Sequence, residues 1–379
     1  MGEIIAGLLL GPSFLGWIAP VWYARLFPLA SLPALNGLSQ VGLVLFMFLV
    51  GLRLDLAEVR AFRRVAGLSA VFSVVLPFVL GLALSSRLYH LAPLSSARLP
   101  FALFIAVSMS ITAFPVLARI LSDRGLVKTR LGHVAISCAA FDDVTAWSML
   151  AAITSIVRAG SADASLYRPA LTVLGYALVM FIPVRVGLGF LSSRFAITDE
   201  LPLVLGFVFL SSWFTESIGI HALFGAFLAG VVWPRDSGDL SGIAEKLEPV
   251  ALAVLIPLFF SYTGIRTNIG LLTSGSLWIY ELAILAVAVG GKAGGAFTGA
   301  RLMGFSLRES MALGCLLNTR GLVELVVLNV GLELGILSPA LFSMMVLMAL
   351  ITTLMAAPVL KWVLPPDYLR QQSVCKGNL

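Results

Sequence analysis

Charged residues are scarce in this sequence. Only 12% of its 379 residues are Asp, Glu, Lys or Arg, whereas about a quarter of the residues in a soluble domain are charged. Hydrophobic residues make up 59%, which excludes a disordered, fibrous or ordinary globular protein. The formal net charge of +6 is not gathered into a basic tract with interleaved aromatic residues, so nucleic-acid binding is not indicated.

Cysteine and histidine are also rare, with three of each. Cys138, Cys315 and Cys375 lie far apart, and the first two fall inside apolar runs, so their spacing predicts neither a disulfide framework nor a metal site. No Ser/His/Asp or Cys/His set converges, so we do not expect an enzyme. The glycines around Lys292 follow no strand and are typical of close helix packing rather than of phosphate binding.

Apolar runs of membrane-spanning length fill most of the chain and are separated by polar or Pro/Gly breaks. They fall at about 3–22, 34–52, 65–89, 100–121, 131–158, 169–191, 201–218, 219–234, 249–265, 277–303, 308–331 and 338–364. We therefore expect an all-α polytopic membrane protein of about 12 transmembrane helices, with one membrane domain over 1–379. The connections between the runs are too short for a separate soluble domain. The seventh and eighth runs meet at 216–221 and are alternatively a hairpin that does not fully cross the bilayer.

The distribution of Lys and Arg predicts the orientation. One set of alternate connections carries 17 of these residues and the opposite set carries six. The richer side is expected to be cytoplasmic, which places both termini of this chain there. The remaining two, Lys292 and Arg320, lie inside predicted spans.

Four charged residues fall near the middle of predicted spans, where each costs about 2.5–3.5 kcal/mol to insert. Asp142 and Asp143 are adjacent in AISCAAFDDVTAW, Lys292 is in VGGKAGGAFTG and Arg320 is in LLNTRGLVEL. Neighbouring helical residues diverge by about 100°, so we expect one aspartate to face a cation while the other meets a basic partner such as Lys292. A carboxylate that binds either a proton or a metal cation is suited to antiport. A purely structural ion pair is the alternative for Lys292, but it leaves the second aspartate unexplained.

Two predicted spans contain interruptions at similar depth. The fourth carries Ser108, Ser110, Thr112 and then Pro115, which lacks an amide donor and frees carbonyl groups near residue 111. The eleventh contains the polar stretch 318–321, Asn-Thr-Arg-Gly, and runs in the opposite direction by the charge count. This pattern predicts an inverted repeat with two crossed, discontinuous helices that meet at an ion site. For Pro115 alone, a simple kink is the alternative.

Charged side chains are expected to balance the dipoles of these half-helices. Arg320 or Lys292 could serve at the helix ends. Glu324 stands four residues after Arg320, so it either pairs with that arginine or contacts the ion directly.

Six segments of the sequence resemble the monovalent cation:proton antiporters, which share the sodium/hydrogen exchanger transmembrane domain, and in particular the branch of Kef-type proteins and plant cation/H+ exchangers. In order they are GEIIAGLLLGPSFLG, AAFDDVTAW, GIHALFGAFLAGVVWP, IPLFFSYTGIRTNI, GGKAGGAFTGARLMGF and LNTRGLVELVVLNVG. The resemblance covers nearly the whole chain. It implies a dimerising scaffold at about 3–52 and 201–265, a linker helix at 169–191, and a mobile core at 65–158 and 277–364.

The resemblance also implies roles for individual residues. Asp143 would alternately bind cation and proton, Asp142 would be the second position of the site, and Lys292 would be its ion-pair partner. Thr112 would lie at the helix break, with Ser110 a further candidate ligand. The Asp-Asp pair is similar to members that exchange two protons per cation.

The substrates implied by this family are H+ and a monovalent cation, K+ or Na+, bound at Asp143 and Asp142. No other cofactor is expected. The protein would be a homodimer in the bilayer, in a bacterial inner membrane. Family members begin with one further helix before GEIIAG, and Kef-type proteins continue into a regulatory domain, so ligand gating of that kind is not expected here. A cation channel or a non-transporting subunit is the rival hypothesis, although no repeated pore loop or acidic ring is present.

Overall fold

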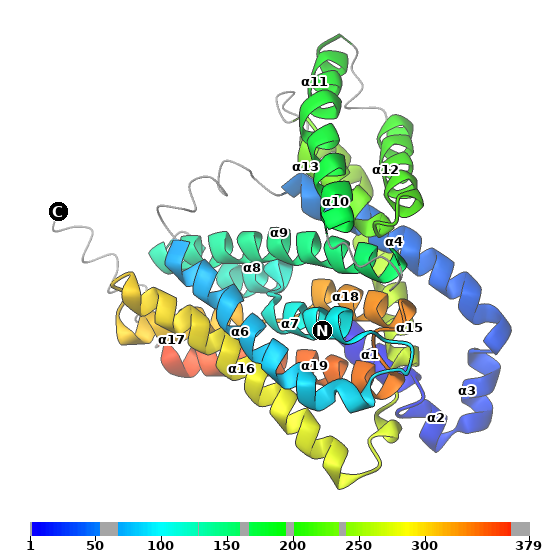
Figure 1. The fold of residues 1–379 in the computed structure, drawn as a ribbon, viewed down its shortest axis with the longest axis vertical. Coiled ribbons are helices and arrows are strands. Elements are labelled where there is room, and N and C mark those ends of the chain that lie inside the picture. Colours follow the sequence, from blue (N-terminus) through cyan, green and yellow to red (C-terminus); the bar gives the residue numbers. More distant parts are fainter. Residues whose placement is uncertain are drawn as a thin grey trace. The chain divides into compact units, whose positions relative to one another are not determined.

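The computed structural model describes residues 2–53, 67–127, 129–159, 167–194, 201–234 and 240–364. Within these ranges the regular secondary structure is helical, with no strand (Figure 1). This confirms the all-α class. Cys375 and the C-terminal tail lie outside the described residues.

The chain divides into two compact units. The first comprises Met1–Asp55 and Trp147–Gly270, and the second comprises Leu56–Ala146 and Leu271–Leu379. The long helix α9, Arg130–Ala159, contributes residues to both units. The assignment of a mobile core and a dimerising scaffold is a functional prediction and stays one.

The helices of the first unit besides α9 include several short pieces. They are α1 (Gly2–Leu10), α2 (Leu15–Ile18), α3 (Pro20–Leu26), α4 (Leu32–Arg53), α10 (Tyr167–Val179), α11 (Arg185–Arg194), α12 (Leu201–Ser217), α13 (Ala222–Val232), α14 (Leu240–Val250) and α15 (Ile256–Arg266). Single π-helical turns join α10 to α11 and α14 to α15. Both pairs therefore continue as one rod, over 167–194 and 240–266.

The second unit contains the longest apolar helices besides α4 and α9. Its elements are α6 (Gly67–Leu88), α7 (Arg98–Ser110), α8 (Phe114–Asp123), the first part of α9, α16 (Gly275–Leu302), α17 (Leu307–Leu317), α18 (Leu322–Glu333) and α19 (Pro339–Val363).

Each predicted apolar run corresponds to helix in the described part of the chain, but length and apolarity support a smaller number of complete spans. Six helical stretches can cross a bilayer by these criteria, or seven if the bent pair α17 and α18 is one span. Several remaining helices, such as α12 and α13, are shorter than a bilayer is thick. The number of twelve spans therefore stays a prediction.

The first predicted run, 3–22, is not one helix. It breaks after Leu10 and again at Ala19, giving α1, α2 and α3. Pro20 stands at the first position of α3, and proline favours the start of a helix over its interior. Apolar character alone does not reveal such breaks.

The connection between α12 and α13 is a tight turn. Gly219 has φ +86°, a conformation that glycine adopts without strain. Glu216 accepts a hydrogen bond from the Ala222 amide at the start of α13 and forms a 2.5 Å ion pair with Arg158. The polar residues of this segment thus hold a hairpin between two short helices.

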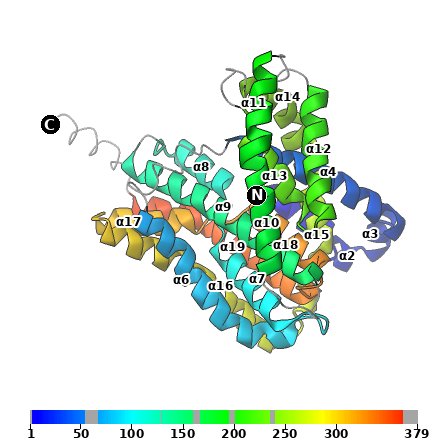
Figure 2. The ribbon, with the colours of Figure 1, turned by 45° about the horizontal axis from the view of Figure 1, so that its top comes forward.

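In the second unit, α6 and α16 lie side by side (Figures 1 and 2). Gly291, Gly295 and Gly299 of α16 face α6 so closely that an added Cβ would come within 3 Å of α6 backbone atoms. Small residues of this kind allow helices to approach within a membrane. This contact fixes the face of α16 that carries Lys292.

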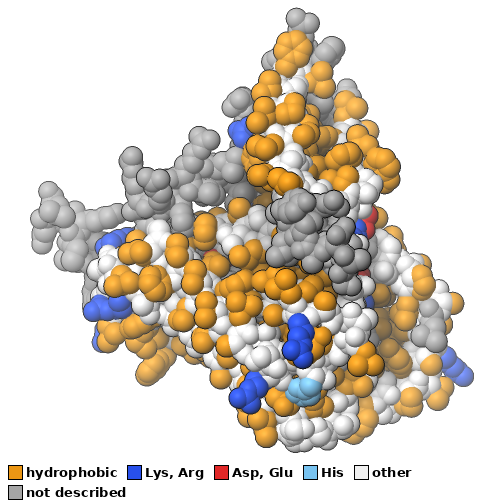
Figure 3. Space-filling model, viewed as in Figure 1, with side chains coloured by type: hydrophobic (Ala, Val, Ile, Leu, Met, Phe, Trp, Pro, Cys, Tyr) orange, Lys and Arg blue, Asp and Glu red, His pale blue; other side chains and the backbone are white. Residues whose placement is uncertain are grey.

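The surface of the described helices is strongly apolar. Hydrophobic side chains cover much of the face seen in Figure 3, with a few basic residues among them. Side chains such as Trp362 and Leu354 are 81% and 53% exposed. Such exposure is expected for a surface that meets lipid rather than water.

Candidate functional site

The first predicted interruption lies between α7 and α8. The α7 helix ends at Ser110, the backbone is extended from Ile111 to Ala113, and α8 begins at Phe114. Pro115 occupies the first turn of α8, where its missing amide hydrogen breaks no helical bond. The break near residue 111 is therefore confirmed.

The second interruption separates α17 from α18, whose axes differ by 43°. It lies against the first break, because the Ala113 amide donates a 2.9 Å hydrogen bond to the Thr319 carbonyl. Position 321 leaves little room for a side chain, since an added Cβ would lie 2.8 Å from Val116 Cγ2 and 3.1 Å from Ala113 Cβ. The two interrupted helices thus meet, as the sequence predicts.

Two cationic side chains lie at the carboxyl end of α7. Arg320 donates to the Ser108 carbonyl and, at 2.7 Å, to the Met109 carbonyl. Lys292 donates to the Ser110 carbonyl. The last carbonyls of a helix have no partner within it and carry its negative dipole end, so both cations offset that charge.

Asp142 is the paired aspartate. Its Oδ2 lies 2.5 Å from Lys292 Nζ and 2.6 Å from Thr112 Oγ1, and its Oδ1 lies 3.4 Å from Ser73 Oγ. Thr112 Oγ1 is also 2.9 Å from the Leu317 carbonyl, so its single hydroxyl proton serves one of the two acceptors at a time. The carboxylate of Asp142 therefore contacts the first helix break directly through Thr112, and the same hydroxyl lies within reach of the second interrupted helix.

Asp143 is buried at 3% exposure but has a different environment. Its Oδ1 has no hydrogen-bond partner, and among the residues that the structure describes Asp143 forms no ion pair. A buried carboxylate is costly unless it is paired, so this oxygen is suited to a proton or a cation.

Arg320 and Glu324 are both fully buried and form a 3.0 Å ion pair one turn apart. Glu324 Oε1 is left without a partner. Of the two alternatives for Glu324, the ion pair is present, and one carboxylate oxygen is still unpartnered. The Ser110 hydroxyl instead donates within the helices, to the Ala106 or Val74 carbonyl at 2.9 and 3.2 Å.

Some residues of the site are not evident from the sequence pattern. Thr353 of α19 accepts from the Arg320 amide at 2.9 Å, and Ser73 of α6 contacts Asp142. A hydroxyl residue in an apolar span is too common to single either out.

Glu281 is 1% exposed in α16, and both of its carboxylate oxygens lack partners. Glu281 was not predicted because it lies near one end of a predicted span, although an acidic residue in an apolar run is a detectable signal.

Buried charged groups gather at the two helix breaks. Within the described ranges no three His, Cys, Asp or Glu side chains converge as multivalent-metal ligands. Instead, one paired and one unpartnered carboxylate lie close to two broken helices, all within the second unit. Broken helices with buried ionisable groups are the arrangement of secondary transporters. The fold and the site define a membrane transporter of this class.

Comparisons with known proteins specify the family. The family model for the transmembrane part of sodium/hydrogen exchangers matches residues 1–365. The chain is 40% identical to the Na+/H+ antiporter NhaS4 of Synechocystis over 375 residues, 96% of this chain and 90% of that one. It is 35% identical to K+/H+ antiporter 1 of Saccharomyces cerevisiae and 37% identical to cation/H+ antiporter 17 of Arabidopsis thaliana. The chain belongs to the sodium/hydrogen exchanger family.

These matches differ in extent. This chain is covered to 97% in both eukaryotic comparisons, but it spans only 44% of the yeast protein and 45% of the Arabidopsis protein. Among solved structures, the sodium proton antiporter MjNhaP1 of Methanocaldococcus jannaschii matches with a TM-score of 0.62 at 16% identity. That match covers 95% of this chain and 88% of the other, and it supports the fold.

Proposed function

We propose that this protein is a secondary active transporter that exchanges a monovalent cation, K+ or Na+, for H+ by alternating access. The observation that carries the proposal is the contrast between the two aspartates. Asp142 is held by Lys292 and Thr112, whereas Asp143 keeps a buried oxygen with no partner. A site that alternates between two cargoes needs a carboxylate that no resident cation occupies.

In this proposal Asp143 carries the cation or the proton, and Asp142 is the second position of the site. Lys292 and Arg320 are the charge partners, and Thr112 is a candidate oxygen ligand at the break. Ser110 and Glu324 contribute further oxygen atoms close to these groups. Exclusive binding of cation or proton follows because both cargoes neutralise the same carboxylate.

The relatives support the substrate class without selecting one ion. They include proteins named as Na+/H+, K+/H+ and cation/H+ antiporters. Both ions are coordinated by oxygen, and selection between them depends on cavity size and ligand number. We therefore propose K+ or Na+ as the exchanged cation, with no cofactor beyond the transported ions.

We further propose that the protein works as a homodimer in the inner membrane of a bacterium. The second unit would be the mobile core, because all of the proposed ion-binding residues belong to it. The presence of a cyanobacterial relative supports the bacterial membrane.

Everted membrane vesicles provide the test. A respiratory proton gradient quenches a pH-sensitive dye, and added K+ or Na+ should restore the fluorescence if the cation is exchanged for H+. We expect Asp143→Asn to abolish this recovery, because an amide cannot exchange a proton for a cation. The matched control is Asp123→Asn, which changes a 69%-exposed side chain at the end of α8 and should exchange normally.

Full cation-dependent recovery in the Asp143→Asn vesicles would refute the assigned role of Asp143. No recovery with wild-type protein that is inserted and folded would favour a channel or a non-transporting subunit. Comparison of K+ with Na+ in the same vesicles ranks the two ions.

A further inference from the structure

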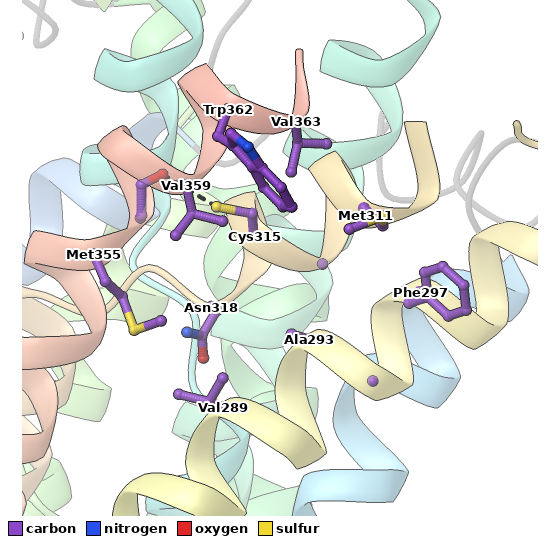
Figure 4. A pocket seen from close by; sticks show the side chains of 13 residues that line it. Val289, Ala293, Phe297, Met311, Cys315, Asn318, Met355, Val359, Trp362 and Val363 are labelled. Atoms are coloured by element: carbon purple, nitrogen blue, oxygen red, sulfur yellow. Dashed lines mark hydrogen bonds between the residues drawn. The ribbon is translucent and has the colours of Figure 1, made fainter. Parts of the chain in front are cut away.

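A pocket of about 300 Å³ lies between α16, α17 and α19, within the second unit. This volume is at the lower end of the range for small-molecule sites. Its lining is almost entirely apolar and includes Val289, Phe297, Met355 and Val359. Figure 4 shows Trp362 and Val363 at one end and Val289 at the other.

Asn318 is the polar exception in this lining. The residue is 4% exposed, and its side-chain oxygen is buried with no hydrogen-bond partner. In Figure 4 its side chain extends into the pocket between Val289 and Met355. The other polar contact in view, from Cys315 to the Ala356 carbonyl, is satisfied within the protein. The pocket therefore offers one free acceptor, and a complementary ligand must bring a donor.

The surroundings of the pocket indicate how a ligand reaches it. Trp362 is 81% exposed and Met311 is 38% exposed, and both line the pocket. They belong to α19 and to the bent pair that contains α17, which are apolar enough to cross a membrane. The solvent at this face is lipid, so the ligand is a molecule dissolved in the bilayer.

The extent of the pocket along α19 indicates the length of that molecule. From Met355 to Val363 the wall follows about two turns of α19, roughly 12 Å at 1.5 Å per residue. A single alkyl chain of about this length can lie along this apolar wall. A bulky charged headgroup has no counter-charge in the lining, because none of the lining residues is ionised.

We propose that this pocket binds a single-chain alkyl alcohol from the membrane, with its chain among the apolar residues and its hydroxyl donating to Asn318 Oδ1. The site is independent of the proposed ion exchange. It adjoins the helix break nonetheless, because Asn318 directly precedes Thr319, whose carbonyl receives the Ala113 amide.

Photolabelling of the full-length protein tests the site. An octanol that carries a photoactivatable diazirine is added to proteoliposomes, and labelled peptides are identified by mass spectrometry. We expect saturable labelling in the α19 stretch around Met355 and Val359 and in α17 at Met311. Unlabelled 1-octanol should compete about fivefold better than octane at equal concentration in the membrane, which is the effect of one hydrogen bond.

Two variants and a control separate the contribution of the apolar pocket from that of the hydroxyl contact. Val359→Phe fills the pocket and should reduce the labelling at least fivefold. Leu354→Phe, at a 53%-exposed position of α19 outside the lining, should not change it. Asn318→Leu should retain labelling but lose the preference for octanol over octane.

Each outcome bears on the proposal. Labelling that is not saturable, or that is equal in wild type and Val359→Phe, overturns the site. Equal competition by octanol and octane in wild-type protein overturns the hydroxyl contact. Gel filtration verifies the folding of each variant, and if Asn318→Leu does not fold, Val359→Phe and the two competitors decide the result.

Discussion

Replacing Lys292 by methionine keeps most of the side-chain volume but removes the charge that faces Asp142. Both members of this pair are completely buried, at a separation of 2.5 Å. Removing one member of a buried ion pair costs about 3–5 kcal/mol, because the other charge is left unpaired. Thr112 and Ser73 still contact Asp142, so we expect a loss near 3 kcal/mol.

The loss should be visible as a lower melting temperature of the detergent-solubilised protein. At about 2.1 cal/mol/K of unfolding entropy per residue, the 379 residues give roughly 0.8 kcal/mol/K, so a loss of 3 kcal/mol corresponds to a decrease of about 4 °C. Fluorescence-detected gel filtration after heating measures this change. Lys361→Met is the matched control, since Lys361 lies in the last turn of α19 and is exposed.

A double variant tests the physical cause. Asp142→Asn together with Lys292→Met removes both charges, and most of the stability lost in Lys292→Met should return because no unpaired charge is left. If Lys292→Met melts like the wild type, or if the double variant is no more stable than Lys292→Met, the ion pair does not stabilise the second unit.

Two further predictions concern packing and a buried acid. Gly321→Ala should slow exchange in the vesicle assay, because the added Cβ would lie 2.8 Å from Val116. Adding Val116→Ala should restore much of the exchange rate. If the rate does not recover, the close contact with Val116 is not the cause of the loss. Glu281→Met should raise the free energy of unfolding by about 1–3 kcal/mol, because it removes a buried carboxyl group whose oxygens are both unpartnered. A lower melting temperature for Glu281→Met would contradict this expectation.

The helix breaks were predictable because their causes are local. Pro115 removes an amide donor, and the stretch 318–321 places polar groups and a glycine inside an apolar run. The separate environments of Asp142 and Asp143 follow from helical geometry, since adjacent residues diverge by about 100°. Helical geometry alone did not determine which aspartate meets Lys292, because the rotation of α9 depends on its packing.

Other features depend on contacts between distant parts of the chain. Arg320 reaches the Ser108 carbonyl across 212 residues, and no local pattern indicates that contact. The sequence suggested Arg320 or Lys292 as a balance for the helix dipoles, and the structure places both at the same end of α7. The division of the first apolar run was missed because hydropathy averages over short breaks.

The residues around the broken helices also set a charge balance. Lys292 and Arg320 contribute two positive formal charges, whereas Asp142, Asp143 and Glu324 contribute three negative ones. These five groups therefore sum to one negative formal charge, and in the proposed exchange a single cation or a single proton on Asp143 would neutralise it. A neutral unit passes through hydrocarbon at far lower cost than a charged one. Under the proposed mechanism, this charge balance would penalise the return of the site without cargo and would make the exchange obligatory. A second proton would first have to displace Lys292 from Asp142.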